Sequence, residues 1–127
     1  MSIKSLSELD DYEFDDRYVA DTLGNVYIFN KLISNYKNFR KMNPFITRDG
    51  YTEFVLMDKN GKKKHIQGQR IVAGLFIPPV KGKNFVNHKD GNRSNNKVTN
   101  LEWVDRSENL LHSYHKLGRI PWNKKMS

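Results

Sequence analysis

Residues 86–112 read VNHKDGNRSNNKVTNLEWVDRSENLLH, and this stretch decides the fold. Short apolar runs at 85–88 and 101–104 predict two strands, and the residues between them are rich in Asn and Gly, which is typical of a loop. An Asp or Ser soon after the second strand can cap a helix over about 105–116, and Gly118 ends it. The stretch therefore predicts strand, long loop, strand and helix in that order.

Polar residues in this stretch suit the hydrolysis of a phosphodiester. Asn87 and Asn109 offer amide oxygens to one hard divalent ion, from the first strand and from the first turns of the helix. His88 is a neutral imidazole near physiological pH and can take a proton from water. Because adjacent residues on a strand face opposite ways, the Asn-His pair can reach the ion and the water separately. Taken alone, Asn100 would be a loop residue and His88 an ordinary buried or surface histidine.

Together these positions resemble the motif of the HNH endonuclease family, specifically its phage and intron-encoded homing endonucleases. The resemblance covers roughly residues 65–115 and implies that His88 is the general base and Asn100 the residue that ties down the loop and positions the His strand. It also implies that Asn87 and Asn109 are the metal ligands, although several relatives carry Asp where this chain has Asn87. The implied cofactor is one divalent metal ion per site, Mg²⁺ or Mn²⁺.

Other polar residues of the region are expected to have structural or surface roles. Asn92, Asn95 and Asn96 are expected to form turns rather than to bind metal, because Asn tolerates left-handed backbone and bonds to it. His112 is an alternative third ligand or phosphate contact, and His65 and His115 are expected on the surface or facing DNA. Leu101 and Trp103 are expected in the core.

The rest of the chain predicts β structure and one further helix. Gln69, where the relatives carry His, receives no catalytic role. Residues 30–47 are expected to be mostly loop. The expected elements are strands at 18–20 and 26–29 around a turn with Gly24, strands at 51–57 and 62–66 around Asp58-Lys59-Asn60-Gly61, and a helix over 70–76 that Pro78-Pro79 stops.

The resulting fold class is α+β, with an N-terminal antiparallel β module followed by a ββα-metal (HNH, His-Me finger) core. We divide the chain into an acidic N-terminal lead-in over 1–16, a β-rich accessory module over 17–64, an HNH nuclease domain over 65–118 and a basic C-terminal tail over 119–127.

Composition narrows the class of protein. The 127 residues include no cysteine, which rules out disulfides, Cys-ligated zinc and a thiol nucleophile. No stretch approaches the ~20 apolar residues of a membrane span, and we expect a cytoplasmic protein of a bacterial or phage-infected cell. No small-molecule substrate is indicated.

The charge is distributed unevenly. The net charge is +8, yet residues 1–16 hold one lysine and six acidic residues, so the remainder carries +13. A basic body of this size, with aromatic residues among its cations, indicates double-stranded DNA as the partner, although a solvated lysine-rich surface is the plainer alternative. The candidate phosphate contacts are Lys62, Lys63, Lys64, Arg93, Lys97, Arg119, Lys124 and Lys125.

The predicted function is a metal-dependent DNA endonuclease of the HNH type that nicks one strand as a monomer. The alternative is a DNA-binding module with an inactive HNH site. A third reading, an RNA-binding β module, rests on charge and aromatic residues alone and does not explain the four motif positions.

Overall fold

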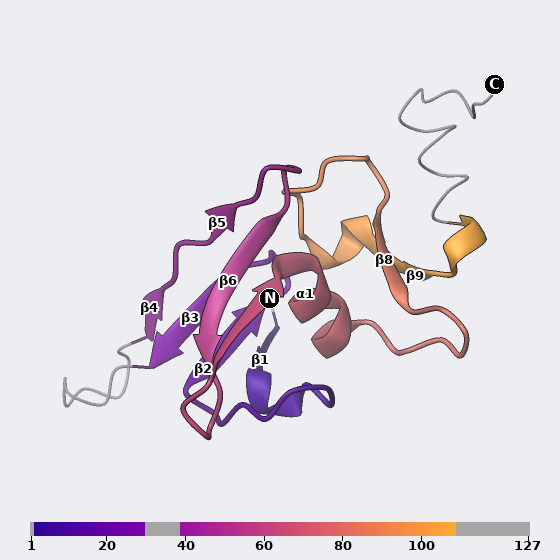
Figure 1. Ribbon diagram of the computed structural model, residues 1–127. Helices are drawn as coiled ribbons and strands as arrows, with labels where there is room; N and C mark the ends of the chain where they lie inside the picture. The colour runs from indigo at the N-terminus through magenta and orange to yellow at the C-terminus, as the bar shows by residue number, and fades with distance from the viewer. Residues whose placement is uncertain (1, 30–38, 109–127) are drawn as a thin grey trace.

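The computed structural model describes residues 2–29 and 39–108, and the expectations for 30–38 and 109–127 lie outside this range. In the described part the fold is mixed α+β, with three small antiparallel sheets and the helix α1 (Gly68–Phe76) (Figure 1). The predicted fold class is therefore confirmed. No helix within these ranges is long and apolar enough to cross a membrane.

The first sheet joins the N-terminus to the predicted β module. Its order is β1-β2-β3-β4, with all neighbours antiparallel. A short 3-10 turn, η1 (Leu6–Glu8), follows the first strand. The strands are β1 (Ile3–Ser5), β2 (Tyr18–Asp21), β3 (Val26–Phe29) and β4 (Phe39–Lys41).

The turn between β2 and β3 is fixed by the buried carboxylate of Asp21. Its Oδ1 accepts hydrogen bonds from the backbone N–H of Leu23 and of Asn25, and its Oδ2 accepts from the Tyr27 hydroxyl. Burial opposes the charged form, but these hydrogen bonds outweigh it and the pKa of Asp21 is lowered. Gly24 has φ +93°, the left-handed conformation that glycine adopts without strain.

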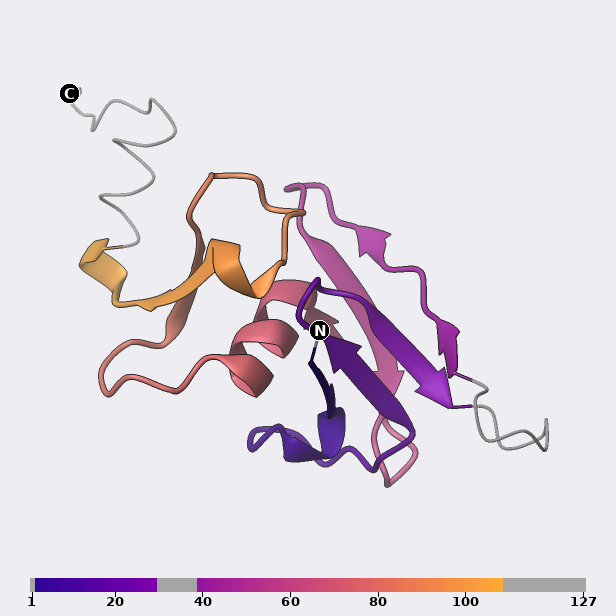
Figure 2. The same cartoon turned by 180° about the vertical axis from the view of Figure 1, so that it is seen from behind.

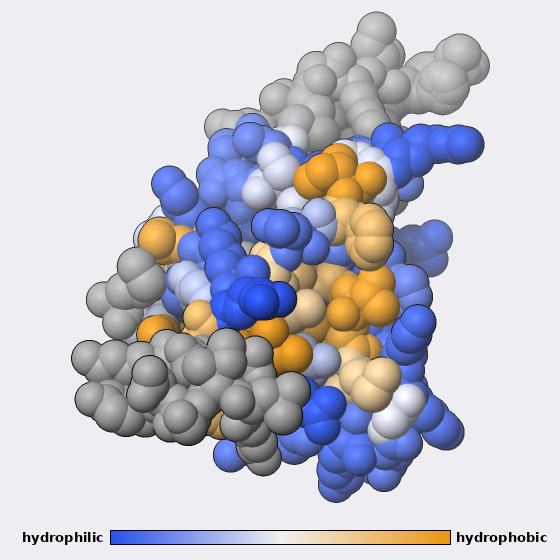
Figure 3. Space-filling model, turned by 90° about the vertical axis from the view of Figure 1, so that its left-hand side faces the viewer, coloured by the Kyte–Doolittle hydropathy of each residue, from blue (hydrophilic) through white to orange (hydrophobic). Residues whose placement is uncertain are grey.

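The second sheet contains β5 (Phe45–Ile46), β6 (Thr52–Met57) and β7 (Lys63–Gln67) in that order. Along β6, buried residues alternate with half-buried or exposed ones, as its apolar alternation predicts. Asp58 closes the following turn, because its Oδ1 accepts from the backbone N–H groups of Asn60 and Lys62. Phe45 and Ile46 of β5 are exposed. On the face of the molecule in Figure 3, hydrophobic residues are interrupted by hydrophilic ones.

Residues 39–47, the described part of the segment expected to be mostly loop, contain more strand than the sequence predicts. The expectation of a loop is wrong at β4 and β5, which are three and two residues long. Their side chains are all exposed. Strands so short and exposed leave no alternation of apolar residues in the sequence from which to recognise them.

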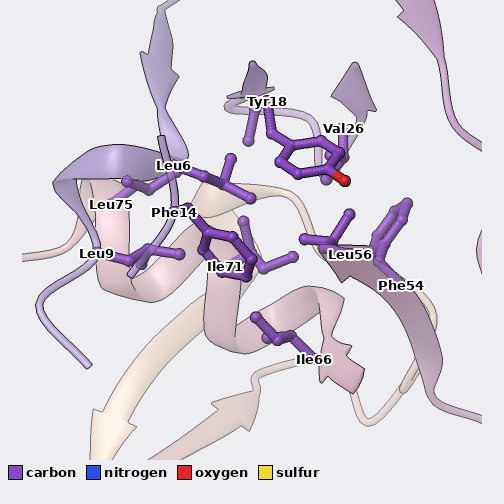
Figure 4. Packing of buried hydrophobic residues seen from close by; sticks show 11 residues of the cluster. Leu6, Leu9, Phe14, Tyr18, Val26, Phe54, Leu56, Ile66, Ile71 and Leu75 are labelled. Atoms are coloured by element: carbon purple, nitrogen blue, oxygen red, sulfur yellow. The ribbon is translucent and has the colours of Figure 1, made fainter. Parts of the chain in front are cut away.

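One hydrophobic core connects the N-terminal segment, both of these sheets and α1. Leu6, Leu9 and Phe14 pack with residues of β2, β3, β6, β7 and α1 (Figure 4). The acidic segment 1–16 is therefore more than a lead-in, because it supplies a strand and three core side chains. The proposed division of the chain into four parts stays a prediction, and this core joins the first three of them.

The β8–β9 hairpin carries the predicted site. It consists of β8 (Phe85–His88) and β9 (Leu101–Val104), joined by a loop that ends in the 3-10 turn η2 (Val98–Asn100). Helix α1 lies between this hairpin and the second sheet, as both views in Figures 1 and 2 show. Residues 106–108 begin a helix, and the rest of the helix expected to about 116 lies outside the described residues.

Candidate active site

Asn87 and His88 are buried on opposite faces of β8. Each residue is only 5% exposed, although adjacent residues of a strand point in opposite directions. Asn87 pairs with Glu102 across the hairpin, and His88 pairs with Leu101. Both faces of this short hairpin are therefore covered where the motif lies.

The amide of Asn87 is oriented by an acidic neighbour. Its Nδ2 donates a hydrogen bond of 2.8 Å to Oε2 of Glu102. The amide oxygen is thereby directed away from the carboxylate, and no described residue donates a hydrogen bond to it. This leaves an oxygen ligand available beside a negative charge.

The imidazole of His88 is held at one nitrogen. Its Nε2 lies 2.7 Å from Oδ1 of Asn96, whose Nδ2 donates in turn to Oγ1 of Thr52 at 2.6 Å. The ring of Tyr51 lies beside the imidazole, with centroids 6.1 Å apart. The second ring nitrogen, Nδ1, has no hydrogen-bond partner among the described residues.

Burial lowers the pKa of His88 below its ordinary value of 6.5. Desolvation disfavours the charged imidazolium and is the largest cause, while the hydrogen bond with Asn96 and the charge of Asp90 act in the opposite direction. The histidine is therefore neutral at physiological pH. A neutral imidazole can accept a proton.

Asn100 connects the two ends of the loop. Its Nδ2 donates to Oδ1 of Asp90 and to the backbone carbonyl of Asn95, both at 2.9 Å, and its Oδ1 accepts from the Asp90 N–H at 3.1 Å. Its backbone carbonyl accepts from the N–H of Lys89 at 2.8 Å. These bonds hold the residues that directly follow His88.

Asp90 is the acceptor at the centre of the loop. Besides Asn100, its carboxylate accepts from Nδ2 of Asn95 at 2.9 Å and from the N–H of Asn92 at 2.8 Å. The bond from the Asn95 side chain is the largest of the causes that lower its pKa to about 2. Asn92 and Asn95 thus bond within the loop, as expected of turn-forming residues.

The cations predicted to contact DNA fall into two described groups. Arg93 and Lys97 lie in the site loop, where Arg93 stacks on Tyr51 with its guanidinium carbon 5.0 Å from the ring centroid and donates to the Asp49 carbonyl at 2.7 Å. Lys62, Lys63 and Lys64 follow the far end of β6, away from Thr52. The structure brings the first group to the site and leaves the second at the other end of the sheet.

Several predicted residues lie outside the described part: Asn109, His112, His115, Arg119, Lys124 and Lys125. In the described part, no group of three or more His, Cys, Asp or Glu side chains could hold a metal ion.

The two residues expected in the core differ in burial. Leu101 is buried, whereas Trp103 is half-buried and donates its Nε1–H to the Ile77 carbonyl at 3.1 Å. His65 is exposed and pairs with Glu53.

Sequence reasoning missed three residues of the site. Asn96, expected to form a turn, is 5% exposed and its side chain joins His88 to Thr52. Thr52 and Glu102 had no predicted role. Their partners are distant in sequence, so no local pattern reveals the contacts.

Comparison with known proteins identifies the family. A family model described as HNH endonuclease matches residues 67–111. The DNA endonuclease I-HmuI of Bacillus phage SP01 is 34% identical over 97 residues, which cover 76% of this chain and 51% of that protein. An HNH endonuclease of Acanthamoeba polyphaga mimivirus is 35% identical over 85 residues, which cover 67% of this chain and 24% of its own length.

A solved structure shows the same relationship. It describes DNA binding and cleavage by the HNH homing endonuclease I-HmuI, and it matches with a TM-score of 0.74 and 31% sequence identity. The match covers 98% of this chain and 64% of that chain. The chain belongs to the HNH endonuclease family, of the phage homing type. It spans between about a quarter and a half of the length of the curated relatives described above.

Proposed function

We propose that this protein is a metal-dependent DNA endonuclease that hydrolyses phosphodiester bonds and nicks one strand of double-stranded DNA as a monomer. The observation that carries the proposal is the pair Asn87 and His88. A neutral, buried imidazole lies next to an amide, and among the described residues neither its Nδ1 nor the amide oxygen has a hydrogen-bond partner. A base and an oxygen ligand are the two groups that such a reaction requires.

His88 acts as the general base. It takes a proton from a water molecule as the water oxygen forms a bond to phosphorus and the bond from phosphorus to the 3′ oxygen breaks. Since its lowered pKa keeps the imidazole neutral, no prior loss of a proton is needed at physiological pH. Asn100 acts indirectly, by holding the loop that follows the base.

The chain's oxygen donors suit a hard divalent ion, Mg²⁺ or Mn²⁺. Asn87 and Asn109 would hold it, with Glu102 orienting the Asn87 amide. A bound ion would supply positive charge to the phosphorane-like transition state and to the leaving 3′ oxygen. Two neutral amides would hold it more weakly than carboxylates would.

The cations of the chain are proposed to hold the DNA backbone. Arg93 and Lys97 are proposed to contact phosphates at the reacting site, since both belong to the loop that follows His88. Lys62, Lys63, Lys64, Arg119, Lys124 and Lys125 are proposed as further contacts. Such contacts hold DNA of any sequence and weaken as salt is added.

Nicking of supercoiled plasmid, with and without Mg²⁺ or Mn²⁺, tests the proposal. The parent should convert supercoiled to open-circular plasmid only when the ion is present. His88→Ala should bind DNA as the parent does and lose cleavage by about 10²–10⁴-fold, the usual effect of removing a general base. Asn109→Ala should lower the rate and weaken the dependence on metal together.

Controls separate the two competing functions. Asn60→Ala removes a side-chain hydrogen bond to Glu13 on an exposed turn and should nick at the parental rate. Cleavage by His88→Ala within a few-fold of the parent would reject the base assignment. DNA binding without metal-dependent cleavage by the parent would instead support a DNA-binding module with an inactive site.

A further inference from the structure

We propose that Asn96 is a positioning residue for the base, and that Thr52 of the second sheet orients Asn96 so that His88 keeps its proton on Nε2 and presents Nδ1 to water. The inference rests on the proposed function, in which His88 is the base. It goes beyond that function by identifying the nitrogen of His88 that accepts the proton and the two residues that determine the tautomer.

The hydrogen bonds run in one direction. An amide has a donor end and an acceptor end, and both ends of Asn96 are engaged. Its Nδ2 donates to Thr52 Oγ1, so its Oδ1 is the atom that faces His88 Nε2 at 2.7 Å. An amide oxygen only accepts, and therefore the hydrogen of this bond belongs to Nε2.

The position of Asn96 is restricted by close packing. A Cβ atom added at Gly68, the first residue of α1, would lie 2.5 Å from Asn96 Nδ2 and 2.6 Å from Thr52 Oγ1. A Cβ at Gly24 would lie 3.0 Å from the Cβ of Asn96. Two glycines thus let the helix and the β2–β3 turn approach the asparagine.

The backbone near Asn96 is attached to the first sheet as well. The N–H of Val98 donates to the carbonyl of Thr22 in the β2–β3 turn at 2.8 Å. Asn96 is therefore held between β6, the β2–β3 turn and the start of α1. In Figure 1 the loop of the β8–β9 hairpin accordingly reaches the beginning of β6.

This arrangement gives the β-rich half of the chain a part in catalysis. A histidine in the other neutral tautomer would carry its proton on the nitrogen that must receive one from water. Holding the proton on Nε2 therefore keeps His88 in the tautomer whose Nδ1 can accept a proton from water. Thr52 has this effect through Asn96 and makes no hydrogen bond to His88 itself.

Nitrogen-15 NMR of the metal-free full chain tests the tautomer directly. Four histidines are present, so the spectrum of His88→Gln assigns the His88 signals by their disappearance. At a pH where His88 is neutral, we expect a protonated Nε2 and an unprotonated Nδ1. A protonated Nδ1 would overturn the inference. This measurement requires no cleavage, so it fails or succeeds independently of the proposed nuclease activity, which the plasmid assay tests.

Variants of the two positioning residues test their effect on the reaction. Thr52→Val removes the hydroxyl that accepts the hydrogen bond from Asn96 Nδ2 and should lower the maximal nicking rate about tenfold, which is less than the loss of about 10²–10⁴-fold expected when the base itself is removed. DNA affinity should be unchanged. Thr52→Ser keeps the hydroxyl and should restore the rate and the parental nitrogen-15 signals. Parental rate and signals in Thr52→Val would overturn the role of Thr52.

Asn96 is tested by a matched pair. Asn96→Leu removes both hydrogen bonds, whereas Asn96→Asp keeps an acceptor for Nε2 and can accept from the Thr52 hydroxyl. We expect Asn96→Asp to retain the parental tautomer and at least a tenth of the rate, and Asn96→Leu to lose more. Asn60→Ala is the control for general loss of stability. If the His88 tautomer in Asn96→Asp differs from that in the parent, the Asn96 amide of the parent must present its Nδ2, not its Oδ1, to His88. That result would overturn the inference.

Discussion

Asn87 is a neutral amide beside the carboxylate of Glu102, and this pairing makes its substitution informative. Asn87→Asp would give the ion a charged ligand but would place two carboxylates where one hydrogen bond of 2.8 Å now exists. We expect parental or faster nicking at saturating Mg²⁺ and a lower thermal midpoint without metal. Repulsion explains the second effect, since like charges at this separation disfavour each other.

The double variant Asn87→Asp with Glu102→Gln provides the control. Glutamine keeps the size of Glu102 and supplies an N–H donor to the new carboxylate, so the metal-free midpoint should recover. Thermal unfolding of the three proteins and Mg²⁺ titration of their nicking rates measure both effects. An unchanged metal-free midpoint in Asn87→Asp would contradict the observed contact with Glu102.

The carboxylate of Asp90 predicts how the stability of the loop changes with acid. Its folded pKa of about 2 lies below the ordinary 3.8, so the charged form is favoured by folding. The contribution of the Asp90 carboxylate to the free energy of unfolding is complete above pH 3.8 and is lost as the pH falls through 2. The free energy of unfolding of the parent and of Asp90→Asn, measured by urea titration at several pH values, should therefore differ most above this window and converge below it. A difference that does not depend on pH would contradict the prediction.

At the scale of elements, a change in the loop between β8 and β9 is expected to affect both the stability of the protein and its activity. Asn100→Ala removes the hydrogen bonds to Asp90 and to the Asn95 carbonyl, and leaves those partners unpaired. The bonds to Asp90 are exposed and the bond to the Asn95 carbonyl is partly buried, so water can partly replace them and each loss costs about 0.5–1.5 kcal/mol. We expect a lower thermal midpoint together with slower nicking, because the residues after His88 are released, and excess metal should not restore the rate. A normal midpoint with normal nicking would remove Asn100 from the site.

Much of the order of elements could be predicted because it depends on local sequence. The turns at Gly24 and at Asp58-Lys59-Asn60-Gly61, the alternation of β6 and the two strands of the motif all have local causes. The partner of Asn96 could not be predicted, because Thr52 is 44 positions away in the sequence. The burial of Leu6, Leu9 and Phe14 could not be predicted either, because acidic residues dominate the composition of the segment around them.

At the scale of the molecule, the two described groups of cations lie at opposite ends of β6. Six residues of strand span about 20 Å, which corresponds to roughly six base pairs along a DNA duplex. A duplex that contacts both groups would therefore follow the length of the second sheet. Phosphate contacts at Lys62, Lys63 and Lys64 would then add to the binding affinity without touching the reacting phosphate.

Salt dependence of binding tests this path. Each lost contact should flatten the slope of log affinity against log salt by about 0.9. We expect Lys97→Gln to flatten it by one contact, and glutamine at Lys62, Lys63 and Lys64 together to flatten it further without changing the nicking rate at saturating protein. Lys81→Gln, an exposed lysine outside the predicted set, is the control. A parental slope in the triple variant would place that end of the sheet away from the duplex.

Helix α1 begins the segment that matches the family, yet much of what buries it comes from earlier in the chain. Leu9 packs so closely that a Cβ atom at Gly74 would lie 2.7 Å from its Cδ2. A polypeptide cut to residues 67–111 would contain every motif residue and still expose Ile71 and Leu75, which the intact core buries. Such a fragment should aggregate or remain unfolded. The motif therefore could not be transferred alone to another protein, because the segment that keeps α1 buried must extend back at least to Leu6.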